Sequence, residues 1–88
     1  MTDDMRRIIN ILVDWMMIQG SGPKDLLQVG AVRKLLQGND DHSLRMKLAL
    51  SLSFGLDPDE VLIWIQTDQG EARLDELLVR CRKAFMNS

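Results

Sequence analysis

The feature that most constrains the fold is an apolar segment over residues 8–18, in which only Asn10 and Asp14 are polar. If residues 3–19 form a helix, its polar positions make one narrow stripe: Asp3, Arg7, Asn10 and Asp14. A surface helix of a small domain usually needs apolar cover over roughly 100° of its circumference, whereas this one needs it on most sides. Because a chain of 88 residues supplies few covering elements, we expect part of this apolar surface to contact another protein.

Composition indicates a single globular domain over residues 1–88, with 45% hydrophobic and 27% charged residues. The acidic and basic residues that give the net charge of −2 are distributed evenly along the chain. The chain therefore lacks the basic surface of most nucleic-acid-binding proteins. Cys81 is the single cysteine, so no intramolecular disulfide can form. The acidic start over residues 1–4 argues against a signal peptide, and the apolar segment is too short to span a membrane. We expect a cytoplasmic protein.

The chain is predicted to be all-α, a compact bundle of about five helices. The expected helices run over about residues 3–19, from Pro23 to Gly38, over about residues 43–54, from Pro58 onward, and over about residues 71–86. Asp57, Pro58 and Glu60 give the clearest start signal, because an N-cap acid, a proline at the first position and a capping-box acid favour a helix start. Gly30 is expected to mark a close helix crossing or a break in its helix. Gly70 is expected to mark an interruption.

The third segment is ambiguous, because its apolar residues alternate: Leu44, Met46, Leu48, Leu50, Leu52 and Phe54. Strict alternation is typical of a half-buried strand. However, residues 43–56 contain no Val, Ile, Thr, Tyr or Trp, which are the residues enriched in strands along with Phe. No other segment offers a partner strand either. We therefore predict a helix that is apolar around most of its circumference and central to the core.

Residues 44–66 contain a predicted corner between two helices. A helix-turn-helix requires a small residue on its first helix, a glycine at the turn and a capped second helix; Ser51, Gly55 and Asp57 meet these requirements. The segment Leu50–Thr67 resembles the helix-turn-helix of bacterial repressors. This resemblance implies an alternative function, that of a DNA-binding transcriptional regulator.

The second helix of this corner departs from the repressor pattern, because it opens with Asp59 and Glu60 and continues with apolar residues. Acidic side chains repel phosphate, and apolar ones cannot read the hydrogen-bonding groups of base edges. If the corner did bind DNA, the phosphate contacts would come from Arg33, Lys34, Arg45 and Lys47. We prefer the interpretation in which the corner joins two core helices and these four side chains are solvated.

The sequence offers little for catalysis or for metal binding. His42 and Cys81 are far apart, and Cys81 lies on the apolar stripe of the last helix, where a small buried thiol is the ordinary interpretation. The carboxylates Asp57, Asp59 and Glu60 are explained by capping of a helix. We therefore expect no enzymatic activity, metal, cofactor or small-molecule substrate.

The function favoured by the sequence is that of a small protein-binding or regulatory module. Its partner is expected to be a second copy, forming a homodimer, or a heterologous protein, with nucleic acid disfavoured and no membrane contact. Interfaces favour Trp and Met anchors together with other apolar side chains. The predicted contact residues are Ile11, Trp15, Met17, Ile18 and Trp64.

Overall fold

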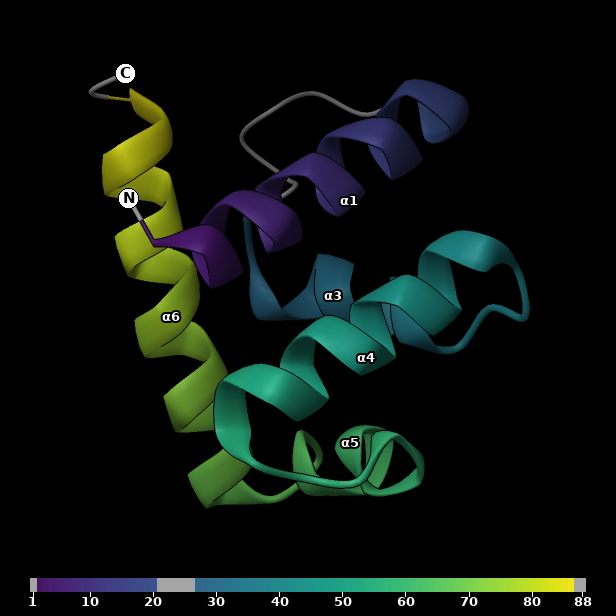
Figure 1. Ribbon diagram of the computed structural model, residues 1–88, viewed down its shortest axis with the longest axis vertical. Helices are drawn as coiled ribbons and strands as arrows, with labels where there is room; N and C mark the ends of the chain where they lie inside the picture. The colour runs from purple at the N-terminus through teal and green to yellow at the C-terminus, as the bar shows by residue number, and fades with distance from the viewer. Residues whose placement is uncertain (1, 21–26, 87–88) are drawn as a thin grey trace.

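The computed structural model describes residues 2–20 and 27–86, which form five α-helices and no β-strand (Figure 1). In chain order the helices are α1 (Asp3–Gln19), α3 (Val29–Leu36), α4 (Asp41–Phe54), α5 (Pro58–Trp64) and α6 (Asp68–Met86). The prediction of an all-α bundle is confirmed. The alternating segment is a helix rather than a strand, as its lack of strand-forming residues indicated.

Local signals explain where helices α1 and α4 begin and end. The Thr2 side chain caps the start of α1, and Gly20 ends the helix in the left-handed conformation, with φ of 76°. The Asp40 carboxylate accepts a hydrogen bond of 3.0 Å from the backbone N–H of Ser43 at the start of α4. Gly55 ends α4 with φ of 68°, a conformation that residues with a Cβ rarely adopt.

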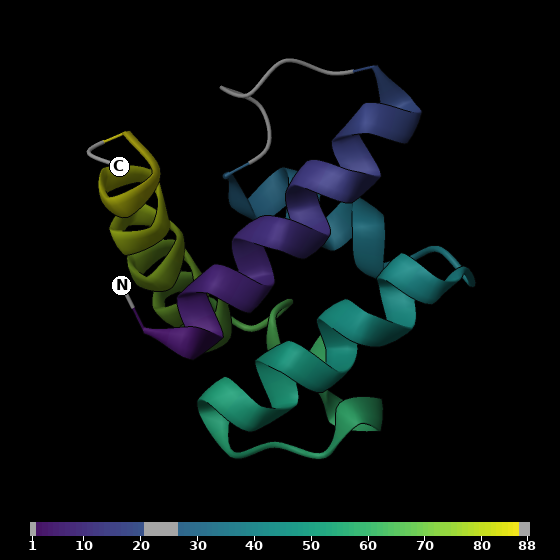
Figure 2. The same cartoon turned by 45° about the horizontal axis from the view of Figure 1, so that its top comes forward.

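Helices α1 and α4 lie side by side and run in opposite directions (Figures 1 and 2). Helix α6 packs on α1, α3 lies behind α4, and α5 folds back beneath α4 (Figure 1). All five helices contribute to one core, for example with Leu12, Leu35, Leu50, Val61 and Leu78. Burial of these apolar side chains is the main force that holds short helices together, because helices of this length are marginal in isolation.

Helix α1 is covered on most sides, as its sequence requires. Ile8 and Leu12 are fully buried, and Ile11 and Trp15 are nearly so. The four residues of the predicted polar stripe, Asp3, Arg7, Asn10 and Asp14, are all exposed, as are Asp4, Arg6, Met17 and Ile18. Helices α4 and α6 provide much of the cover.

Two predicted helix starts are wrong. The second helix begins at Val29 rather than at Pro23, after the buried Leu27 and an N-cap, Gln28, whose side chain makes no capping hydrogen bond. Pro23 itself lies outside the described residues. The last helix begins at Asp68, three residues before its predicted start.

Helix α5 begins at Pro58 as predicted, but the predicted capping box does not form. Asp57 occupies the N-cap position without a side-chain capping hydrogen bond. Instead, the backbone N–H of Glu60 donates to the Asp57 carbonyl over 2.9 Å. The fixed φ of Pro58, at the first position of the helix, is therefore the local feature that favours the start of α5.

Candidate interaction surface

Helix α4 has two apolar faces, and only one of them belongs to the core. Met46 and Leu50 are fully buried and Ala49 is 2% exposed. On the other side Leu44, Leu48 and Leu52 are 57%, 45% and 68% exposed. We call these three side chains the outer leucine row.

The alternating pattern explains this division. Successive residues of an α-helix are rotated by about 100°, so residues two apart point about 200° apart, to nearly opposite sides. Every second member of an alternating series therefore falls on the same side, four residues from the next. Met46 and Leu50 face inward, whereas the outer leucine row faces outward with a spacing of four.

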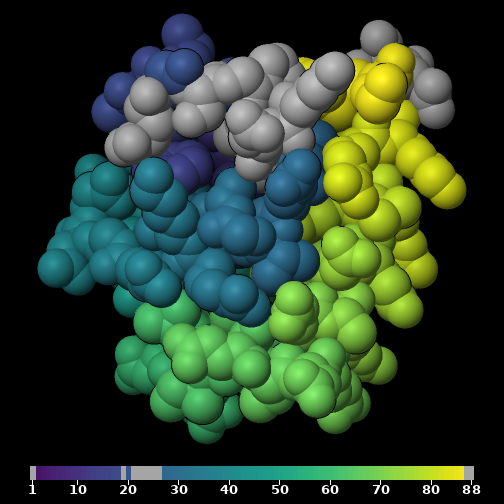
Figure 3. All heavy atoms as spheres, turned by 180° about the vertical axis from the view of Figure 1, so that it is seen from behind, coloured from purple at the N-terminus to yellow at the C-terminus, as the bar shows by residue number. Residues whose placement is uncertain are grey.

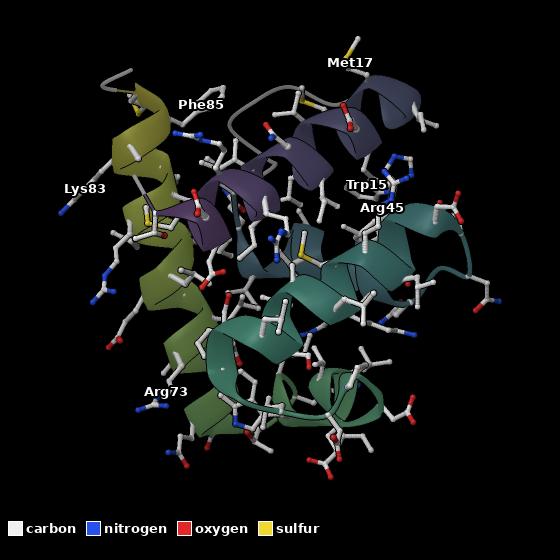
Figure 4. The ribbon with its side chains drawn as sticks, in the orientation of Figure 1. Trp15, Met17, Arg45, Arg73, Lys83 and Phe85 are labelled. Carbon is white, nitrogen blue, oxygen red and sulfur yellow. The ribbon has the colours of Figure 1, made fainter. Side chains whose placement is uncertain are left out.

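A groove of about 620 Å³ lies between two members of the outer leucine row, Leu48 and Leu52, and the polar stripe of α1. From α4 it is lined by Arg45, Leu48, Ala49 and Leu52, and from α1 by Asp3, Arg6, Arg7, Asn10, Ile11 and Asp14. One wall is therefore mainly apolar and the other is polar with charges of both signs. Figure 4 shows Arg45 on α4, on the side that faces α1.

The groove lies on the side of the molecule opposite to α3. Seen from behind, the surface is made by α3 together with α6 and the segment that contains α5 (Figure 3). Helices α1 and α4 occupy the other side (Figure 1). A partner seated on α1 and α4 would therefore leave the α3 side uncovered.

The five predicted contact residues do not form one exposed patch. Ile11 and Trp15 are 7% and 8% exposed, so they belong to the core, which removes the reason for predicting them as contact residues. Met17 and Ile18 are 75% and 67% exposed, and Met17 projects outward from the end of α1 (Figure 4). Trp64 is half-buried, and its ring centroid lies 4.6 Å from that of Phe54.

The four basic residues considered for DNA contact are not brought onto one surface. The Arg33 guanidinium points into the fold, where it donates to the Ile65 carbonyl over 3.4 Å and lies 3.7 Å from the Glu71 carboxylate. Arg45 and Lys47 are two residues apart on α4, so they point to nearly opposite sides of the helix. Lys34 is exposed on α3.

The α4–α5 corner itself forms as predicted. The Ser51 hydroxyl donates to the Leu56 carbonyl, and Gly55 provides the turn between the two helices. The first turn of α5, however, exposes Asp59 and Glu60. The corner thus has the local geometry of the motif without a basic surface at its second helix.

Among the titratable side chains of residues 2–20 and 27–86, Cys81 is the most strongly perturbed. It is fully buried on α6, and burial raises the pKa of its thiol from 9.0 to about 11. A thiol in such surroundings stays protonated and is a poor nucleophile at neutral pH. Within residues 2–20 and 27–86, no three His, Cys, Asp or Glu side chains are grouped so that they could hold a metal ion.

The outer leucine row is the surface that the sequence did not identify as a contact site. Its signal is present in the alternating pattern, which predicts a helix central to the core rather than a helix with one exposed apolar face. In the part of the chain that the structure describes, no helix combines the length and hydropathy needed to cross a membrane. The sequence matches no protein-family model, no curated protein and no solved structure, so the candidate site is defined by its geometry.

Proposed function

We propose that this protein acts through protein–protein contact and associates with itself as a homodimer. The observation that carries the proposal is the outer leucine row, three neighbouring leucines on one helix that are each about half exposed or more. Large exposed apolar patches on small proteins are commonly interaction sites. The contact surface proposed is the outer leucine row together with the groove beside α1.

The size of the surface suits a helical contact. Residues 44 to 52 span about 12 Å along the axis of α4, and α1 widens the surface on one side. Burial of a leucine side chain stabilises an assembly by about 1.5–3 kcal/mol when it is complete. The half-exposed leucines of two copies can supply about half of that each, and the polar wall of the groove can form the rim of the interface.

Measurement of molecular mass by light scattering or sedimentation tests the proposal. The wild-type chain is expected to be a dimer, and Leu48→Asp is expected to be a monomer with unchanged helical circular dichroism. Ile63→Asp is the matched control, because Ile63 is also an exposed apolar residue, 69% accessible, but lies on α5 outside the groove. A wild-type chain that is monomeric at every concentration, or a dimer equally sensitive to both substitutions, would contradict the proposal.

A further inference from the structure

The exposed charges of α1 are arranged in a way that complements a second copy of the same face. Arg7 and Asp14 lie on the groove, on opposite sides of Asn10 along the helix. On α4, Leu44 and Leu52 lie four residues on either side of Leu48. Both helices therefore have a natural midpoint, at Asn10 and at Leu48, and both midpoints line the groove.

Both midpoints lie within the stretches of α1 and α4 that line the groove. Because α1 and α4 run in opposite directions (Figure 2), the Asp14 half of α1 lies beside the Arg45 half of α4, and the Arg7 half lies beside Leu52. A single axis across the two helices can therefore pass close to both Asn10 and Leu48. A two-fold axis in this place would relate two copies with each helix antiparallel to its equivalent.

We infer that two copies of the chain pack through this α1–α4 face about such a two-fold axis, forming a bundle of four helices. The inference rests on the proposed function and adds the arrangement of the partner. Leu48 would contact the partner's Leu48, and Leu44 the partner's Leu52. Arg7 would pair with the partner's Asp14, and this ion pair occurs twice in the dimer.

Another arrangement is possible in which α4 packs on the α1 of the second copy. It would place Asp14 against the partner's Arg45, which is also a favourable charge pair. It would, however, set the outer leucine row against the polar stripe of α1, so that leucines and charged groups are buried against each other. Burial of charged groups without partners is costly. The arrangement in which each helix packs antiparallel on its own equivalent is therefore favoured, because it places leucines against leucines.

A charge-exchange experiment tests this arrangement. Arg7→Glu makes the paired positions on both sides of Asn10 acidic, and Asp14→Arg makes both of them basic. Each variant alone is expected to dimerise about tenfold more weakly than wild type, because like charges meet twice in the interface. An equimolar mixture is expected to form a heterodimer of near wild-type affinity, since one ion pair keeps its wild-type polarity and the other is restored with reversed polarity.

Control variants on α6 measure the effect of charge alone. Arg73 and Asp75 are exposed on α6, away from the groove (Figure 4 labels Arg73). Arg73→Glu and Asp75→Arg are expected to leave the dimer affinity within about twofold of wild type, singly and mixed. Circular dichroism of all four variants verifies that each one is folded before affinities are compared.

The outcomes separate this inference from the proposed function. A monomeric wild-type chain would overturn both. A dimer that Leu48→Asp disrupts, but that the mixture of Arg7→Glu and Asp14→Arg does not restore, would overturn this arrangement and leave the proposed function in place. If a chain carrying Arg45→Glu restores dimerisation of Asp14→Arg, then α4 packs on the α1 of the second copy. That result would overturn the arrangement in which each helix packs on its own equivalent.

Discussion

Gly70 illustrates how a single residue can fix the junction of two helices. A Cβ added at Gly70 would lie 1.9 Å from the backbone oxygen of Trp64, so the turn between α5 and α6 could not keep its position. We predict that Gly70→Ala lowers the free energy of unfolding by about 2 kcal/mol or more, as overpacking against backbone does. Urea denaturation followed by circular dichroism measures this change.

Gly30 provides the matched control for that substitution. It lies in the first turn of α3, and an added Cβ would meet no other atom within 4 Å. Gly30→Ala is predicted to raise the free energy of unfolding by about 0.5–1 kcal/mol, because alanine restricts the unfolded chain and favours helix. The sequence suggests a close helix crossing or a break at Gly30; the close contact is at Gly70, six residues after the Trp64 carbonyl that it approaches. Equal effects of the two substitutions would contradict this assignment.

Cys81 gives a prediction for stability at alkaline pH. Burial raises the pKa of its thiol from 9.0 to about 11, so the thiol ionises in the unfolded chain before it ionises in the folded one. The stability that the neutral thiol contributes is complete below pH 9.0 and is lost as the pH rises to about 11. Relative to Cys81→Ala, the wild-type chain should lose about 2 kcal/mol of unfolding free energy over this range. Parallel stability curves for the two proteins would contradict the prediction.

At the scale of the element, α4 shows what an alternating pattern means when it folds as a helix. Because alternate members point to opposite sides, the pattern creates one buried and one exposed apolar face rather than a helix buried all round. Leu50→Ala is predicted to lower the free energy of unfolding by about 2–5 kcal/mol, since it leaves a cavity in the core. Leu48→Ala, two residues away, is predicted to lower it by less than about 1 kcal/mol.

The comparison of these two alanine variants should be made at a protein concentration low enough for the chain to be monomeric. Self-association would otherwise add to the apparent stability of the wild-type chain. Similar losses for Leu48→Ala and Leu50→Ala would mean that both faces of α4 are buried in the monomer. That result would remove the basis for the outer leucine row.

Most helices could be predicted from the sequence because their ends carry local signals. The apolar segment marks α1, and Pro58 marks the start of α5. The start of α3 could not be predicted, because Leu27 is buried outside a helix and the N-cap residue Gln28 makes no side-chain capping hydrogen bond. In that position the tertiary contact of Leu27, rather than a local preference, decides where the helix begins.

For the whole molecule, the sequence predicted a surplus of apolar surface but not its location. The sequence pattern predicts that α1 contacts a partner chain through Ile11 and Trp15, yet both side chains are buried once the helices have packed. The surplus lies on α4, because the core covers one of its two apolar faces and leaves the other to solvent. Which face is covered depends on the contacts of α1, α3 and α5 with α4, and no local sequence pattern contains that information.

The salt dependence of association is a property of the whole dimer. Added salt is expected to change the dissociation constant in opposite directions in the wild type and in Arg7→Glu. In the wild type, Arg7 would be attracted to the partner's Asp14, so added salt should weaken the dimer by about twofold to fivefold through screening of two exposed pairs. In Arg7→Glu the same positions repel, and salt should strengthen the dimer, because the outer leucine row still drives contact. Sedimentation at low and high ionic strength measures both dissociation constants. The same direction of change in both proteins would show that these two positions do not meet in the dimer.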